Sequence, residues 1–90
     1  MSALLLKLSG CARHIEINSY DKLADLTQPN TKVVPLNDGV HLLVHSGATE
    51  GSPEEINDIA TILCVNGSNA QEIIFGDCVL MDVVNFYDIK

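Results

Sequence analysis

Positive charge is scarce in this sequence. Of its 90 residues, 5 are Lys or Arg and 12 are Asp or Glu, which gives a formal net charge of −7 at pH 7. Proteins that bind DNA or RNA neutralise phosphates with lysine and arginine, so this balance argues against direct nucleic-acid binding. Residues 46–90 hold eight of the acidic side chains and one lysine, whereas residues 1–45 are neutral. This asymmetry indicates either a solvated acidic face or a surface that docks onto a basic partner.

Paired cysteines and long apolar runs are also missing. The three cysteines are widely spaced and form no Cys-x-x-Cys motif, so neither a disulfide framework nor a thioredoxin-type site is indicated. The apolar run at residues 3–6 is cut by Lys7 and is shorter than a signal-peptide core or a membrane span. We therefore expect a cytoplasmic protein with no membrane partner.

Motifs for catalysis and cofactor binding are absent as well. The sequence has no Gly-x-Ser-x-Gly, Gly-x-Gly-x-x-Gly or Walker pattern. Glu54 and Glu55 lie in a predicted first helical turn, where stabilisation of the helix dipole is sufficient to explain them. We predict no catalytic residues, no cofactor and no enzymatic activity.

Metal binding is not indicated either. Cys11 and His14 have a plausible zinc-ligand spacing, but the other two cysteines stand alone in apolar runs, where a free cysteine is usually a small buried hydrophobe. His41 and His45 lie four residues apart on a predicted strand, or about 13 Å, which is too far for one ion to join them. We expect both histidines to be exposed polar positions, and we predict no metal site.

What the sequence does contain is a regular succession of apolar segments and turns, in a length that suits one domain over residues 1–90. An Asn-Asp-Gly turn at residues 37–39 and a Ser-Gly turn at residues 9–10 each stand between two such segments, as in β-hairpins. The segments with the β-branched and apolar character of strands are residues 3–8, 13–18, 32–36, 39–45, 72–75 and 78–84.

Two segments carry the start signals of helices. Ser19 is placed to cap a short amphipathic helix at residues 20–26. Ser52, Pro53 and Glu55 have the spacing of a capping box, so a second helix is expected to begin there. Together with the strands, these signals predict a single compact α+β domain with a mainly antiparallel sheet and two short helices.

Few side chains are available to bind an anionic ligand. The candidates are Arg13, Lys32 and the side-chain amide of Asn57, and Thr61 completes the set of predicted ligand-binding residues. The loop at residues 46–52 has the small residues of an anion cradle, but the acidic residues in and after it would repel a phosphate. A chain this short buries little surface by itself, so we expect a homo-oligomer whose interface encloses the ligand.

Four short stretches follow one another along the chain: Leu36-Asn37-Asp38-Gly39-Val40-His41-Leu42, Gly51-x-Pro53, Asn57-Asp58-Ile59-Ala60-Thr61 and Ile74-Phe75-Gly76-Asp77-Cys78-Val79-Leu80. In this order they resemble a family of small domains of unknown function that are common in phages and mobile elements. The resemblance implies no reaction. It implies a short accessory protein in the cytoplasm of a host cell, of a kind that frequently counters bacterial immunity.

Together, the residues and the resemblance predict a non-enzymatic binding protein with an anti-defence role. Its predicted ligand is a small signalling nucleotide of the cyclic or ADP-ribose type, sequestered at an oligomer interface. The alternative is an acidic protein–protein inhibitor that covers a basic groove of a host defence or nucleic-acid enzyme.

Overall fold

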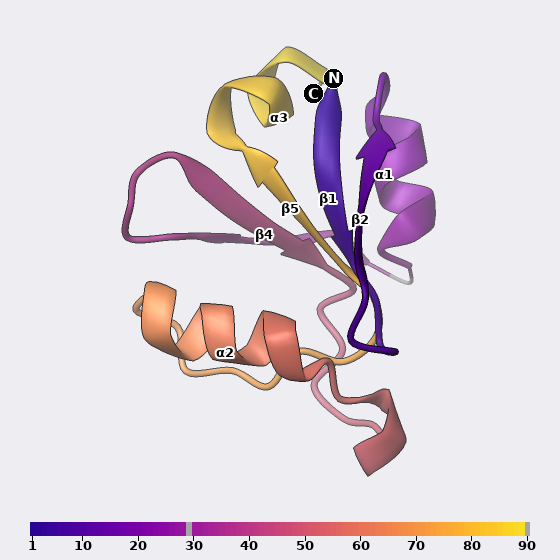
Figure 1. Cartoon of the computed structure of the whole chain (residues 1–90), viewed down its shortest axis with the longest axis vertical. Coiled ribbons are helices and arrows are strands. Elements are labelled where there is room, and N and C mark those ends of the chain that lie inside the picture. Colours follow the sequence, from indigo (N-terminus) through magenta and orange to yellow (C-terminus); the bar gives the residue numbers. More distant parts are fainter. Residues whose placement is uncertain (29, 90) are drawn as a thin grey trace.

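A five-stranded antiparallel sheet runs through the part of the chain that the computed structural model describes, residues 1–28 and 30–89 (Figure 1). In space the strands follow the order β2-β1-β5-β4-β3. Their bounds are β1 (Ser2–Leu6), β2 (Ala12–Glu16), β3 (Lys32–Pro35), β4 (His41–His45) and β5 (Cys78–Asp82). With its helices the sheet makes a single compact α+β domain, which confirms the predicted fold class.

The two hairpins lie where the turn residues place them. β1 pairs with β2 and β3 pairs with β4, both antiparallel. Gly39 adopts a φ of 72°, which an L side chain rarely adopts, so the Asn-Asp-Gly turn needs glycine at this position. The Oδ1 of Asp38 accepts hydrogen bonds from the backbone N–H groups of Val40 and His41 and closes the turn.

The centre of the sheet is formed by β5, which lies between β1 and β4. The prediction of a strand at residues 78–84 is therefore right for most of its length. The prediction of a strand at residues 72–75 is wrong, because that segment crosses one face of the sheet instead of joining an edge. Phe75 makes one isolated bridge with Ile56, and Ile74 is fully buried in the core.

Helices cover both faces of the sheet. The helices α1 (Tyr20–Leu26) and α3 (Val83–Ile89) contribute Leu23 and Phe86 to a core cluster on one face. On the other face, α2 (Asp58–Gly67) contributes Ala60 and Cys64 to a second cluster. Figure 1 shows α1 beside β1 and β2, with α2 lying across the opposite end of the sheet.

The helix boundaries differ in part from those the sequence predicts. α1 has its predicted bounds, and Ser19 accepts the capping hydrogen bond from the N–H of Lys22. The capping box at Ser52 is present, but it begins only a 3-10 turn, η1 (Pro53–Glu55). The α-helix starts at Asp58, with Asn57 as its N-cap. A third helix, α3, takes up the end of the predicted strand 78–84. It begins where Asp82 accepts a hydrogen bond from the N–H of Val84.

Among the described residues, no helix has the length and apolar character needed to cross a membrane.

Candidate functional site

A cavity of about 380 Å³ lies between the end of β4, the loop that follows it, and the irregular segment at residues 71–75, which we call the crossing segment. Its lining includes Lys32 and His45 from the sheet, Ala48 from the loop, and Glu72, Ile73 and Phe75 from the crossing segment. A volume of this size falls within the range of small-ligand pockets. We call it the β4 cavity.

The β-sheet register brings the two basic side chains of the cavity together. Lys32 is the direct partner of His45 across the β3–β4 pair, so both side chains point to the same face. The crossing segment covers that face, and His45 is therefore 2% exposed. The prediction that His45 is an exposed polar position is wrong for this reason, whereas His41, outside the covered area, keeps a side-chain exposure of 44%.

The ring of His45 is fixed in one tautomer. The backbone N–H of Gly47 donates a hydrogen bond of 3.1 Å to its Nδ1, which must therefore carry no proton. In the neutral ring the proton then lies on Nε2, which becomes a hydrogen-bond donor. Burial lowers the pKa of His45, the nearby Glu72 raises it, and Lys32 lowers it, with burial the largest of these influences. Because its pKa is lowered, the ring of His45 is neutral at every pH above the ordinary titration range of histidine.

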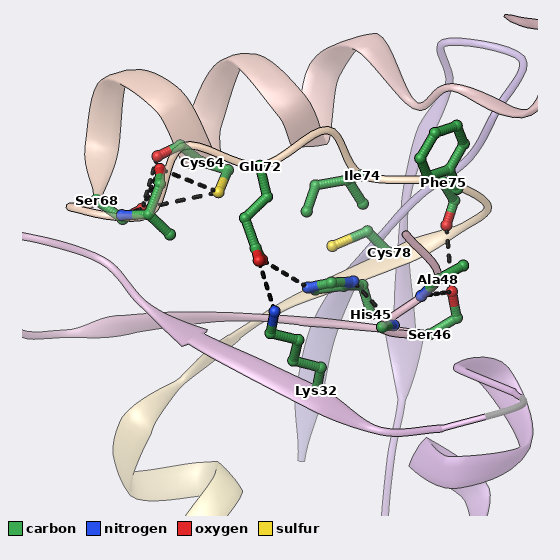
Figure 2. Close-up of polar contacts among 12 residues, drawn as sticks. Lys32, His45, Ser46, Ala48, Cys64, Ser68, Glu72, Ile74, Phe75 and Cys78 are labelled. Carbon is green, nitrogen blue, oxygen red and sulfur yellow. Dashed lines mark hydrogen bonds and ion pairs between the residues drawn. The ribbon is translucent and has the colours of Figure 1, made fainter. Parts of the chain in front are cut away.

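The Nε2–H of His45 is an unsatisfied donor. It has no hydrogen-bond partner within residues 1–28 and 30–89, and the same holds for the buried Oε1 of Glu72. These two atoms lie 3.7 Å apart, which is too long for a hydrogen bond. The other carboxylate oxygen of Glu72, Oε2, accepts a hydrogen bond from the Nζ of Lys32 (Figure 2). The cavity wall thus holds two positively polarised donors, of which only the lysine is satisfied.

The apolar wall of the cavity depends on Gly51. A Cβ atom at this position would lie 2.8 Å from Cδ1 of Phe75, so the glycine permits the aromatic ring to pack directly on the backbone. The hydroxyl of Ser46 donates to the carbonyl oxygen of Phe75 at 3.4 Å and joins the loop after β4 to the crossing segment. Ile73 is 52% exposed at the cavity and adds apolar surface.

In the loop at residues 46–52, three of the backbone donors are already used within the loop and its neighbours. The N–H of Gly47 is bound to His45, that of Ala48 to the hydroxyl of Ser46, and that of Ser52 to Glu55. The loop also leads into a 3-10 turn and not directly into an α-helix. An anion cradle of the helix-terminus type is therefore not formed here.

Of the four predicted ligand-binding residues, Lys32 lies in the β4 cavity. Arg13 is exposed on β2, and its register partner Leu5 packs into the core cluster of α1 and α3, so Arg13 points to the other face of the sheet. Thr61 lies on α2, where its hydroxyl accepts a hydrogen bond from the N–H of Ile74. The structure does not bring these side chains together at one site.

Asn57, the fourth predicted residue, is 1% exposed and is occupied by internal hydrogen bonds. Its Oδ1 caps α2 by accepting from the N–H of Ala60. Its Nδ2 donates to the carbonyl oxygens of Leu6 and Gly76, at 2.8 Å and 3.0 Å. Both hydrogens of the amide are therefore used to hold α2 against the sheet.

Among the cavity residues that sequence reasoning missed are the two whose side chains face each other, His45 and Glu72. The available signal for His45 was its position at the end of an apolar strand, two residues before a glycine. Glu72 carried no comparable signal, because a single carboxylate before an apolar run is commonplace.

The cysteines follow the sequence expectation in their burial. Cys64 and Cys78 are buried free thiols, and Cys11 is exposed. Burial raises the pKa of the Cys78 thiol to about 12, so it stays protonated. No group of three or more metal-ligating side chains occurs within the described part of the chain.

Comparison of the chain with protein-family models, curated proteins and solved structures finds no match. The resemblance to the phage domain family therefore stays a prediction.

Proposed function

We propose that this protein is a non-enzymatic binding protein that sequesters a small signalling nucleotide of the cyclic or ADP-ribose type, with the β4 cavity as its site. The observation that carries the proposal is the pair of donors on neighbouring strands, the ammonium of Lys32 and the unsatisfied Nε2–H of His45. A phosphate group accepts hydrogen bonds from such donors, and charge-assisted bonds of this kind are strong.

The rest of the cavity suits the other part of a nucleotide. Ile73 and Phe75 supply apolar surface against which a planar base would pack. Sequestration requires tight binding and no chemical step, so it places no demand for a nucleophile or a general base near the ligand.

Self-association is part of the proposal, because the cavity is open beside exposed apolar side chains. Ile73 lies at the cavity, and Ile62 on the outer side of α2 is 57% exposed. The side chain of Gln71 donates to the carbonyl oxygen of Val65, which connects the cavity segment to the same helix. A second copy on this surface would bury apolar area and narrow the cavity mouth.

The biological setting of the proposal comes from the resemblance to phage and mobile-element domains. A short accessory protein that removes a signalling nucleotide from the cytoplasm of the host would weaken a bacterial defence. We propose this anti-defence role for the protein.

The test is a thermal-shift measurement against a panel of cyclic nucleotides and ADP-ribose derivatives. A ligand at 100 times its Kd adds about 2.7 kcal/mol to the folded state, which is a readily measured shift. The bound compound should be recovered intact after denaturation. Lys32→Met should abolish the shift, and Lys22→Met, at an exposed lysine on α1, is the matched control. A panel without any shift would overturn the proposal.

One observation favours a second candidate, the acidic protein–protein inhibitor. Glu50, Glu54, Glu55 and Asp58 are all exposed within nine residues that contain no cation. Such a surface would fit a basic groove on a host enzyme. The two functions differ in salt dependence, because an acidic surface loses affinity steeply with ionic strength and a buried ligand loses less.

A further inference from the structure

The carboxylate of Glu72 lies between the two donors of the β4 cavity. Figure 2 shows the side chain extending from the crossing segment toward Lys32 on one side and His45 on the other. Its Oε2 accepts from Lys32 Nζ, and its Oε1 faces His45 Nε2 at 3.7 Å. A negatively charged group of this protein therefore occupies the place that an anionic ligand would take.

Glu72 fits this place only in part. Its carboxylate satisfies the lysine but does not reach the histidine, and the Nε2–H and Oε1 atoms are both buried without a partner. A buried donor that forms no hydrogen bond is a cost to the folded state, and any group that completes the bond recovers it. A phosphoryl group has three terminal oxygens and is not tethered to the crossing segment, so it can accept hydrogen bonds from both donors. The carboxylate of Glu72 accepts from only one of them.

We propose that Glu72 is an internal competitor of the ligand: its carboxylate holds the oxyanion site between Lys32 and His45 closed, and the phosphoryl or carboxylate group of a ligand binds there by displacing it. This inference deepens the proposed function and, for its nucleotide ligand, rests on it.

Displacement of Glu72 is feasible because the side chain is neither deeply buried nor held by regular structure. Lys32 and Glu72 have side-chain exposures of 47% and 29%, and partly exposed ion pairs contribute little to stability. Residues 68–77 form no helix or strand, and their one β-bridge joins Phe75 to Ile56, outside the five strands of the sheet. The carboxylate can turn outward into water, which solvates it fully.

The neutral form of His45 sets the charge balance of the site. Gly47 holds Nδ1 as an acceptor, so the proton of the neutral ring lies on Nε2, which is 3.7 Å from Oε1 of Glu72. The site thus has one full positive charge and one neutral donor, against one internal negative charge. With Glu72 in place the site is electrically neutral, and with Glu72 displaced it carries the charge of Lys32.

The test compares the wild-type protein with Glu72→Ala and Glu72→Gln by isothermal titration calorimetry. Alanine removes the competing group, and glutamine keeps its volume but removes its charge. If the displaced state makes up a tenth of the wild-type population, removal of the competitor lowers the apparent Kd by about tenfold. The expected order of affinity is Glu72→Ala, then Glu72→Gln, then wild type.

Four probes distinguish the sources of the oxyanion: inorganic phosphate, acetate, adenosine monophosphate and adenosine. Phosphate and adenosine monophosphate should gain affinity in both variants, whereas adenosine, which has no oxyanion, should not. A gain for acetate that exceeds the gain for phosphate would assign the site to carboxylates, and equal gains would show that it takes either oxyanion. Asp25→Asn, an equal change of charge on α1 at the other face of the sheet, should leave every affinity unchanged.

A double variant tests the role of His45. In Glu72→Ala/His45→Asn, the asparagine Oδ1 takes the place of Nδ1 as the acceptor for Gly47, but the donor Nε2–H is gone. The gain in phosphate affinity should then be lost. Thermal melts confirm that each variant is folded, and Glu72→Gln remains the informative variant if the alanine protein does not fold.

The outcomes separate this inference from the proposed function. If the wild type binds no nucleotide but the Glu72 variants bind phosphate, the competitor stands and nucleotide sequestration fails. If the wild type binds a nucleotide and the Glu72 variants gain nothing, sequestration stands and the competitor is refuted. If the Glu72 variants bind no oxyanion probe, the competitor role is refuted, and if the panel of signalling nucleotides also gives no thermal shift, sequestration is refuted with it.

Discussion

Replacement of Asn57 by alanine should lower the free energy of unfolding by about 3 kcal/mol, because this one buried side chain serves three backbone groups. The loss of the cap on the N–H of Ala60 accounts for about 1 kcal/mol. The carbonyl oxygens of Leu6 and Gly76 lose the donor Nδ2 at 2.8 Å and 3.0 Å, which adds about 2 kcal/mol because neither regains full access to water.

The assay is urea unfolding followed by circular dichroism, together with a thermal melt. For a domain of this size, a loss of 3 kcal/mol corresponds to a decrease in Tm of about 15 °C. Asn57→Asp keeps the capping oxygen but places a carboxylate oxygen against the two carbonyl oxygens, so it should cost at least as much as Asn57→Ala through repulsion and burial of charge. Ser19→Ala removes only an exposed cap from α1 and should cost about 1 kcal/mol. If Asn57→Ala costs no more than Ser19→Ala, the internal bonds of Asn57 are not stabilising and our reasoning about this residue is refuted.

Two further predictions concern the β4 cavity. Because burial lowers the pKa of His45 below its ordinary 6.5, the unfolded chain binds the proton first as the pH falls. His45 should therefore leave the free energy of unfolding independent of pH above about pH 6.5. Below that pH the free energy should decrease by at most about 1.4 kcal/mol per pH unit, until the pH falls below the pKa of His45 in the folded protein. The charge of Glu72 opposes this effect, and that of Lys32 adds to it. Urea unfolding at several pH values measures this slope, and His45→Asn should remove it; an unchanged slope would show that another group is responsible. Gly51→Ala places a Cβ 2.8 Å from the ring of Phe75 and should cost about 1–3 kcal/mol by overpacking, whereas an unchanged denaturation midpoint would show that the wall yields freely.

Local signals in the sequence determined the hairpins and the first helix. The Asn-Asp-Gly turn and the Ser19 cap act through backbone angles and hydrogen bonds within a few residues, so neighbouring residues are sufficient to specify them. The same locality explains two errors. A capping box at Ser52 is a correct local feature, but its turn ends at Glu55, where the backbone of residues 55–57 pairs with residues 74–76 before α2 starts behind Asn57. The strand predicted at residues 72–75 has the right composition, yet it lies over the sheet.

The candidate site was decided by the tertiary structure. Lys32 and His45 meet through strand pairing across a hairpin, and Glu72 reaches them from 27 residues further along the chain after α2 has intervened. No periodicity links residues this far apart. Asn57 is the opposite case, a residue that the sequence suggests for the site but that the tertiary structure excludes from it. Both hydrogens of its side-chain amide donate to backbone carbonyl oxygens, so none is left for a ligand. Local signals thus determined the hairpins and the first helix, whereas the crossing of one segment over β4 determined which side chains share a cavity, because long-range packing alone sets that geometry.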